Sequence, residues 1–176
     1  MKANEEVTSN NPDEWEQLEA YYNIANTSPI YTAKLTIPGI ESKTMETPTA
    51  LKAKTLDHLD TQYPNSQWIH VFTDGSSEDA VKKGGAGILI LIPNTPKLEL
   101  SVATGKLSTN YRAELQAILE ESKALEEQRL KGANIVFLCD CMSVLQTIQN
   151  EPKDLLTKTT VELLNQLSAN NKVVLQ

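Results

Sequence analysis

The segment WIHVFTDGSS, residues 68–77, decides the fold class. Its first six residues are rich in β-branched and aromatic side chains, which are typical of a strand, and Asp74–Ser77 then gives a turn signal. Outward from this segment, the glycine-rich residues 84–87 lead into the apolar run 88–92, and Leu98–Thr104 alternates apolar with polar residues. Because these runs are joined by short connections, the pattern predicts three antiparallel strands.

The residues after Thr104 predict helices and two further strands. Ser108, Thr109 and Asn110 offer side chains that cap a helix, and apolar residues recur after them with the 3.6-residue period. A buried strand over residues 134–139 follows this helical crossover and should lie parallel to an earlier strand. The remaining elements are helices over about 143–149 and 155–169 and a fifth strand that begins at 172. The order βββαβααβ predicts an α/β fold with a mixed five-stranded sheet and flanking helices.

Residues 1–67 differ from the rest of the chain in composition and in the spacing of apolar residues. Residues 1–12 are polar and are expected to be disordered, and residues 13–23 have the weak apolar spacing of a short helix. Residues 24–65 contain four prolines, at 29, 38, 48 and 64, and favour an extended linker with local turns. We therefore divide the chain into a polar tail and linker, 1–67, and a domain, 68–176.

Composition limits the classes of function. The 176 residues are 40% hydrophobic, which suits one domain with a tail. No apolar run of about 18 residues occurs and no apolar segment follows Met1, so we expect a soluble, intracellular protein without a membrane span. Residues 1–67 have five Lys against ten Asp/Glu, a net −5, and residues 68–176 have eleven Lys/Arg against thirteen Asp/Glu, a net −2. This acidity disfavours tight non-specific binding of nucleic acid, unless bound divalent ions reverse the local charge.

The two cysteines, Cys139 and Cys141, do not indicate a zinc site or a disulfide. They flank a single residue and are too close to bridge in an extended strand. The sequence has no second cysteine pair, and both histidines are distant from this one.

Three carboxylates stand where core packing would not place them. Asp74 ends the first predicted strand, Asp140 ends the fourth, and Glu114 lies in the first turns of the intervening helix. If the first and fourth strands are parallel neighbours, both aspartates lie at one edge of the sheet and the helix start leans over it. Carboxylates this close repel one another unless cations separate them, and oxygen ligands suit Mg²⁺ or Mn²⁺. Two such ions about 4 Å apart can clamp an in-line phosphoryl displacement.

Taken singly, each carboxylate has a simpler explanation. Asp74 can be a turn residue, because Asp-Gly is a common turn signal. Glu114 can complement the dipole at a helix start, and Asp140 can be a helix N-cap. These alternatives become less favoured only if all three carboxylates lie together at one edge of the sheet.

Four short motifs resemble the ribonuclease H type 1 family, with the best likeness to the RNase H domains of retrotransposon polyproteins. They are Thr73–Ser77, Gly85–Gly87, Thr109–Leu115 and Leu138–Asp140, in the family's order within the 109 residues 68–176. The resemblance implies an RNase H-like fold and hydrolysis of the RNA strand of RNA–DNA hybrids with two Mg²⁺ ions, for which Mn²⁺ can substitute. It also implies that Asp74, Glu114 and Asp140 are catalytic residues and metal ligands.

The same resemblance implies a set of substrate contacts, at Ser76, Thr109 and Asn110. Thr109 matches a residue near a phosphate of the DNA strand, and Asn110 one in the minor groove, where an amide can bond the ribose 2′-hydroxyl. The alternative for Asn110 is helix capping. Arg112 can bind a phosphate or brace the acidic cluster, and bracing is favoured. The implied partner is an RNA–DNA hybrid; a former link to a reverse transcriptase and a monomeric state are further expectations.

Departures from the family pattern leave alternatives open. The family's fourth carboxylate and an assisting histidine lie beyond the fifth strand, in which this sequence ends, so we expect both to be missing. His58 and His70 are not expected to substitute, and Cys141 stands where the family has serine. We therefore retain two hypotheses, an active hybrid endoribonuclease and a catalytically inactive nucleic-acid-binding module or retroelement remnant. An actin-like ATPase is disfavoured, because it would need a second Asp-x-Gly turn and a longer chain.

Overall fold

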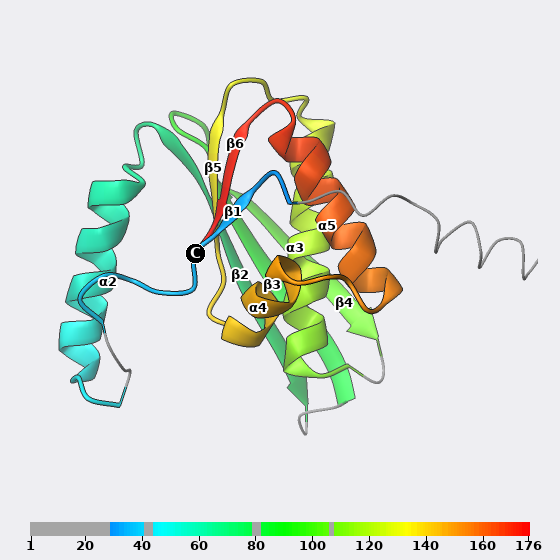
Figure 1. Ribbon diagram of the computed structural model, residues 1–176, viewed down its shortest axis with the longest axis horizontal. Helices are drawn as coiled ribbons and strands as arrows, with labels where there is room; N and C mark the ends of the chain where they lie inside the picture. The colour runs from blue at the N-terminus through cyan, green and yellow to red at the C-terminus, as the bar shows by residue number, and fades with distance from the viewer. Residues whose placement is uncertain (1–28, 41–43, 79–81, 106–107) are drawn as a thin grey trace, which may run out of the picture.

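The computed structural model describes residues 29–40, 44–78, 82–105 and 108–176 (Figure 1). The expectations for residues 1–12 and 13–23 lie outside the described residues. In chain order the elements are β1 (Thr32–Ala33), α2 (Pro48–Gln62), β2 (Trp68–Glu78), β3 (Lys82–Leu91), β4 (Leu98–Gly105), α3 (Asn110–Glu127), β5 (Asn134–Leu138), α4 (Met142–Gln149), α5 (Leu155–Ser168) and β6 (Lys172–Leu175).

The strands form one mixed sheet in the order β1-β6-β5-β2-β3-β4. β2, β3 and β4 are an antiparallel meander, whereas β5 lies parallel to β2 and β6 lies parallel to β5. The predicted mixed sheet and the order of its elements are confirmed. The described sheet has six strands rather than the predicted five, because Thr32 and Ala33 pair in parallel with Val174 and Leu175 of β6.

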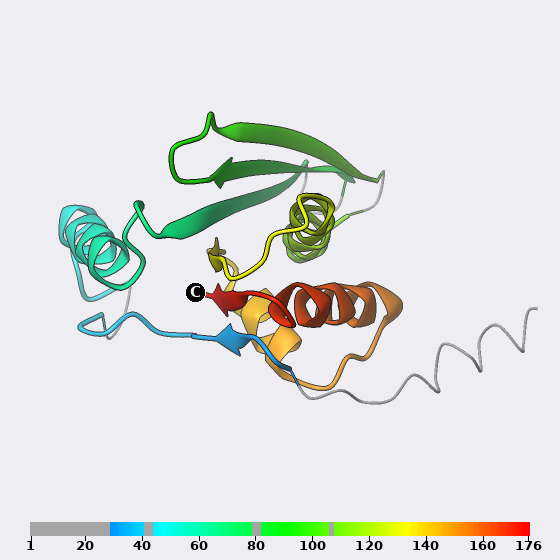
Figure 2. The same ribbon diagram turned by 90° about the horizontal axis from the view of Figure 1, so that it is seen from above.

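Helices α3, α4 and α5 cover one face of the sheet (Figure 2). Because alternate strand residues point to one face, Val71, Ile135 and Phe137 meet Leu115 and Ile118 of α3 in the main core. All five side chains are at most 1% exposed, and each such burial contributes about 1.5–3 kcal/mol. No helix among the described residues is long and apolar enough to cross a membrane.

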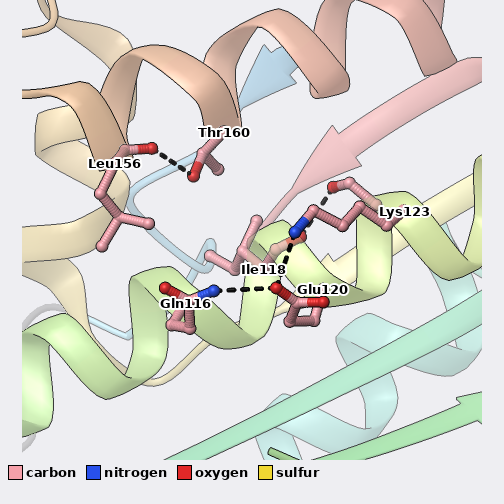
Figure 3. Close-up of polar contacts among 7 residues, drawn as sticks. Gln116, Ile118, Glu120, Lys123, Leu156 and Thr160 are labelled. Carbon is pink, nitrogen blue, oxygen red and sulfur yellow. Dashed lines mark hydrogen bonds and ion pairs between the residues drawn. The ribbon is translucent and has the colours of Figure 1, made fainter. Parts of the chain in front are cut away.

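Polar pairs along α3 and α5 satisfy their side chains locally (Figure 3). On α3, Glu120 accepts hydrogen bonds from Gln116 Nε2 at 2.9 Å and from Lys123 Nζ at 2.8 Å. On α5, the buried hydroxyl of Thr160 donates to the backbone oxygen of Leu156 at 2.8 Å. Side-chain pairs such as the two on α3 stabilise a helix by about 0.2–0.5 kcal/mol each.

Helix α2 corrects the prediction of an extended linker over residues 24–65 for Pro48–Gln62, whereas residues 24–28 and 41–43 of that linker lie outside the described residues. Thr47 caps the helix, since its hydroxyl accepts from Ala50 N at 3.3 Å, and Pro48 occupies the first turn, where its missing N–H breaks no helical bond. On the sequence alone the prolines favour an extended linker with local turns, whereas Pro48 starts a helix. No residue of α2, all of which is described, is fully buried, so the helix has no fully buried face.

The end of α2 covers part of the second face of the sheet, on the opposite side from α3 (Figure 2). There a smaller apolar cluster joins Trp68 of β2, Val136 of β5 and Val174 of β6 to Tyr63, with Leu59 packed against it. The described residues that precede Trp68 therefore contribute to the core of the folded chain.

Candidate active site

The register of β2 and β5 places two aspartates at one edge of the sheet. The strands are parallel neighbours, as predicted, and their last recorded pair is Phe72 with Leu138. Asp74 and Asp140 each stand two residues beyond that pair, and both side chains are exposed. The carboxyl ends of β2 and β5 and the starts of α3 and α4 meet at the lower end of the sheet in Figure 1.

Glu114 reaches the same edge from α3. The residue is 3% exposed, and its Oε1 accepts a hydrogen bond from Gly75 N at 2.5 Å. Its Oε2 accepts from the thiol of Cys139, whose Sγ is 3.8 Å away. The Glu114 carboxylate thus lies between the residue that follows Asp74 and the residue that precedes Asp140.

A glycine at position 75 is what allows α3 to approach β2 so closely. A Cβ at this position would lie 2.6 Å from Glu114 N and 2.9 Å from Glu114 Cγ, closer than real Cβ contacts come. The first of these atoms is backbone, so the helix as a whole would have to shift. Gly75 therefore determines the distance between the strand and the Glu114 side chain.

The structure removes the simpler explanations of the three carboxylates. Asp74 pairs with Gly87 inside β2 and does not lie in a turn. The N-cap of α4 is Cys141, not Asp140. Glu114 is buried against the sheet rather than exposed at the first turn of its helix. The polar character of these positions is therefore not explained by local secondary structure.

The turn predicted at Asp74–Ser77 is wrong, because β2 continues to Glu78. Asp-Gly favours a turn through its local chemistry, but here Gly75 and Ser76 pair with Ala86 and Gly85 of β3. Pairing between strands overrides the local preference.

The three carboxylates are not preassembled as a metal site. Within the described parts of the chain, no group of three or more His, Cys, Asp and Glu side chains is placed to hold a metal ion. The chemistry of the donor set nevertheless fits Mg²⁺ or Mn²⁺, which prefer carboxylate oxygens. Asp74 and Asp140 are exposed, so a change of their rotamers toward Glu114 needs no repacking of the core.

The sequence did not single out two further residues, Cys139, which contacts Glu114, and Glu121, which lies two turns along α3. Burial raises the pKa of the Cys139 thiol to about 12, so the thiol stays protonated and remains a hydrogen-bond donor at neutral pH. Glu121, two turns after Glu114 on α3, is fully buried, and within the described residues neither of its carboxylate oxygens has a hydrogen-bond partner. Burial, and secondarily the charge of Glu114, raise the pKa of Glu121 well above its usual value. Glu121 follows Glu114 by seven residues, a spacing that places both carboxyls on one side of a helix. This spacing could have predicted from the sequence that Glu121 lies on the same side of α3 as Glu114.

The residues implied in substrate contact lie around the same edge. Ser76 is exposed on β2, one residue beyond Gly75. Thr109 is the N-cap of α3, with its hydroxyl accepting from Arg112 N at 3.2 Å, so the capping residue is Thr109 rather than Asn110. Asn110 is the exposed first residue of α3.

Arg112 and the two histidines have other neighbours. Partial burial acts to raise the pKa of Asp154, at the start of α5, but hydrogen bonds from Thr157 and the nearby Arg112 lower it overall.

The ring of His70 contacts the backbone oxygen of Tyr63 at 2.6 Å, and that of His58 contacts Gln176 Oε1 at 3.3 Å. Both histidines thus contact residues next to α2 or β6, and the bracing role expected of Arg112 stays a prediction.

Comparison with known proteins gives the family. The family model for RNase H matches residues 66–176, and no curated protein matches the chain. The chain is similar to the structure of RNase H1 from the halophilic archaeon Halobacterium salinarum NRC-1, with 15% identity and a TM-score of 0.49 over 62% of this chain and 83% of that one. It is similar to LC11-RNase H1 in complex with RNA/DNA hybrid, with 18% identity and a TM-score of 0.49 over 61% of this chain and 84% of that one. It is also similar to the N-terminal RNase H domain of rv2228c from Mycobacterium tuberculosis, with 15% identity and a TM-score of 0.49 over 62% and 86% of the two chains. The family match spans every element from β2 to β6 and well over half of the chain, which therefore belongs to the RNase H family.

Proposed function

We propose that this chain hydrolyses the RNA strand of RNA–DNA hybrids at the sheet edge that carries Asp74, Glu114 and Asp140. Membership of the RNase H family supports the substrate class. The observation that carries the proposal is that three elements bring carboxylates to one edge, where Glu114 is bonded to neighbours of both aspartates. No local role in a turn or a cap accounts for these residues.

Asp74, Glu114 and Asp140 are the residues that would hold divalent cations. Bound Mg²⁺ or Mn²⁺ would supply the activation of water and the neutralisation of charge that phosphodiester hydrolysis requires. In the chain itself, Glu114 is fixed by Gly75 and Cys139, while the exposed aspartates adjust to a ligand. The fixed carboxylate orients the site, and the exposed pair leaves it open to a bulky duplex.

Substrate contacts are proposed for the residues around this edge. Asn110 lies four residues before Glu114, hence on the same side of α3 and one turn nearer its start. An amide there is suited to hydrogen-bond a ribose 2′-hydroxyl, the group that distinguishes RNA from DNA. Ser76 and Thr109 flank the edge on β2 and α3 and are proposed to contact the backbone of the hybrid.

A second candidate function is hybrid binding without cleavage. It is favoured by one observation, that the described carboxylates do not form a three-residue metal site. In that case the edge would still bind nucleic acid through its polar side chains, without activating water.

Cleavage of a labelled RNA–DNA hybrid in Mg²⁺ or Mn²⁺ tests the proposal. We expect the unaltered chain to cut the RNA strand and Asp74→Asn to lose the activity. A matched control is Asp60→Asn, an exposed aspartate on α2, which should leave cleavage unchanged. Hybrid binding without cleavage by the unaltered chain would support the second candidate instead, and equal activity of the two variants would contradict the assigned site.

A further inference from the structure

Cys139 connects two of the elements that build the proposed site. It is 8% exposed and lies between the end of β5 and Asp140. Its Sγ lies 3.8 Å from Glu114 Oε2 and 3.8 Å from Cys141 O, so the single thiol proton has two acceptors within reach, and Sγ accepts from Cys141 N at 3.4 Å. The thiol therefore links the start of α4 to the carboxylate on α3.

The two oxygens of Glu114 are held from the two strands that carry the aspartates. Oε1 is bonded to the backbone N–H after Asp74, and Oε2 is bonded to the side chain before Asp140. A carboxylate with a donor on each oxygen cannot turn about its last bond without losing one of them. Donors of this kind orient the carboxylates that bind metals, and their loss typically costs about 10–100-fold in metal affinity or activity.

We propose that Cys139 is a positioning residue that fixes the Glu114 carboxylate, and thereby its direction toward a divalent cation. The assignment rests on the proposed function. In this proposal the hydrogen-bond donor of Cys139 matters, and the packing of its sulfur does not. Serine keeps a donor and should therefore replace Cys139 better than valine, which fills the space without a donor.

Binding of Mn²⁺ without any hybrid present is the first test. We expect Cys139→Val to weaken Mn²⁺ binding by about 10-fold or more and Cys139→Ser to stay within about 3-fold of the unaltered chain. Cys141→Ser is the matched control, because the thiol of Cys141 contacts Ser143 Oγ and not Glu114. The Mn²⁺ concentration that gives half-maximal cleavage should move in the same order. Thermal unfolding of each variant verifies the fold, and Cys139→Ala replaces the valine variant if valine does not fold.

The contact itself can be observed without metal or activity. The chain has two cysteines, so in Cys141→Ser the infrared S–H stretching band belongs to Cys139 alone. We expect Glu114→Gln, which weakens the acceptor, to shift that band to higher frequency. An unmoved band overturns the assignment.

The two proposals fail in different ways. If the unaltered chain neither binds Mn²⁺ nor cleaves a hybrid, the proposed function fails and the role of Cys139 fails with it. If the unaltered chain binds Mn²⁺ and folded Cys139→Val binds it equally well, only the role of Cys139 is overturned.

Discussion

At the scale of single residues, Gly75 has the most demanding position near the site. Replacing it with alanine places a methyl group 2.6 Å from the backbone of Glu114, so α3 must move away from β2. We expect Gly75→Ala to lower the free energy of unfolding by about 1–3 kcal/mol, which is the usual cost of overpacking. Urea denaturation measures this loss.

The matched control for this substitution is Gly85→Ala in β3. A Cβ at position 85 would meet nothing nearer than Val102 O at 3.8 Å, which is an ordinary contact. An unfolding midpoint of Gly75→Ala equal to that of Gly85→Ala would contradict the close approach of helix and strand.

Glu121 should make stability depend on pH. Burial raises its pKa in the folded chain above the ordinary value of 4.5, so the folded chain holds the proton more tightly than the unfolded chain does. This contribution to stability is complete below about pH 4.5 and declines as the pH rises through the folded pKa. Glu121→Gln, which has the same shape and no charge, should therefore flatten the fall in stability as the pH rises above 4.5.

Urea unfolding at several pH values measures this slope, with Glu127→Gln, an exposed neighbour on α3, as the control. A slope for Glu121→Gln as steep as that of the unaltered chain would show that Glu121 does not titrate on unfolding.

The sequence alone predicted those site residues that follow a recognisable pattern along the chain. Asp74 and Asp140 each follow a β-rich run, and their common edge follows from the parallel pairing rule for a helical crossover. Cys139 and Glu121 were missed because their roles depend on which atoms pack around them. The thiol of Cys139 matters because Glu114 lies against it, and no pattern along the chain records that contact.

At the scale of elements, the periodicity of the chain predicted the order of the strands and helices from β2 to β6. Each of these elements has either an apolar stripe or a buried run, and each is bounded by turn or capping residues. The failures were β1 and α2. A strand of two residues has no detectable period, and α2 touches the core only near its end, through Leu59 and then Tyr63.

Strand β1 is expected to be secured chiefly by Tyr31. The side chain is 6% exposed, and its hydroxyl donates to Ile148 O in α4 at 2.8 Å. Removing a buried aromatic ring costs about 3–5 kcal/mol, and losing one hydrogen bond alone costs about 0.5–1.5 kcal/mol. Tyr31→Ala should therefore destabilise the chain several times more than Tyr31→Phe, as measured by urea unfolding.

Thr32→Ala, at the exposed first residue of β1, is the control and should change stability little. If Tyr31→Ala unfolds at the same urea concentration as this control, β1 does not contribute to the folded core.

At the scale of the whole molecule, the fold begins before the residues that match the family. The family match starts at residue 66, yet Lys34 N donates to Leu175 O at 2.8 Å, and Gln176 Nε2 donates to Thr36 O at 3.1 Å. On the other face, Tyr63 stacks edge-on against Trp68 with ring centroids 4.9 Å apart. Lys34, Thr36 and Tyr63, all of which precede residue 66, thus contact β6 or the second face of the sheet.

A chain restricted to residues 66–176 should consequently be less stable than one that begins at residue 29. It lacks Tyr63 and Leu59, which cover Trp68, Val136 and Val174, and it leaves the edge of β6 unpaired. A loss of several kcal/mol lowers the melting temperature by on the order of 10 °C in a chain of this size. The sequence has two tryptophans, Trp15 and Trp68, and Trp15 precedes residue 29. Trp68 is therefore the sole tryptophan of each of the two shortened chains, and its fluorescence reports on the second face of the sheet. We expect the emission of the shorter chain to shift to the red as water reaches the indole ring. Equal melting temperatures and equal emission maxima would mean that the RNase H fold of this chain is complete without residues 29–65.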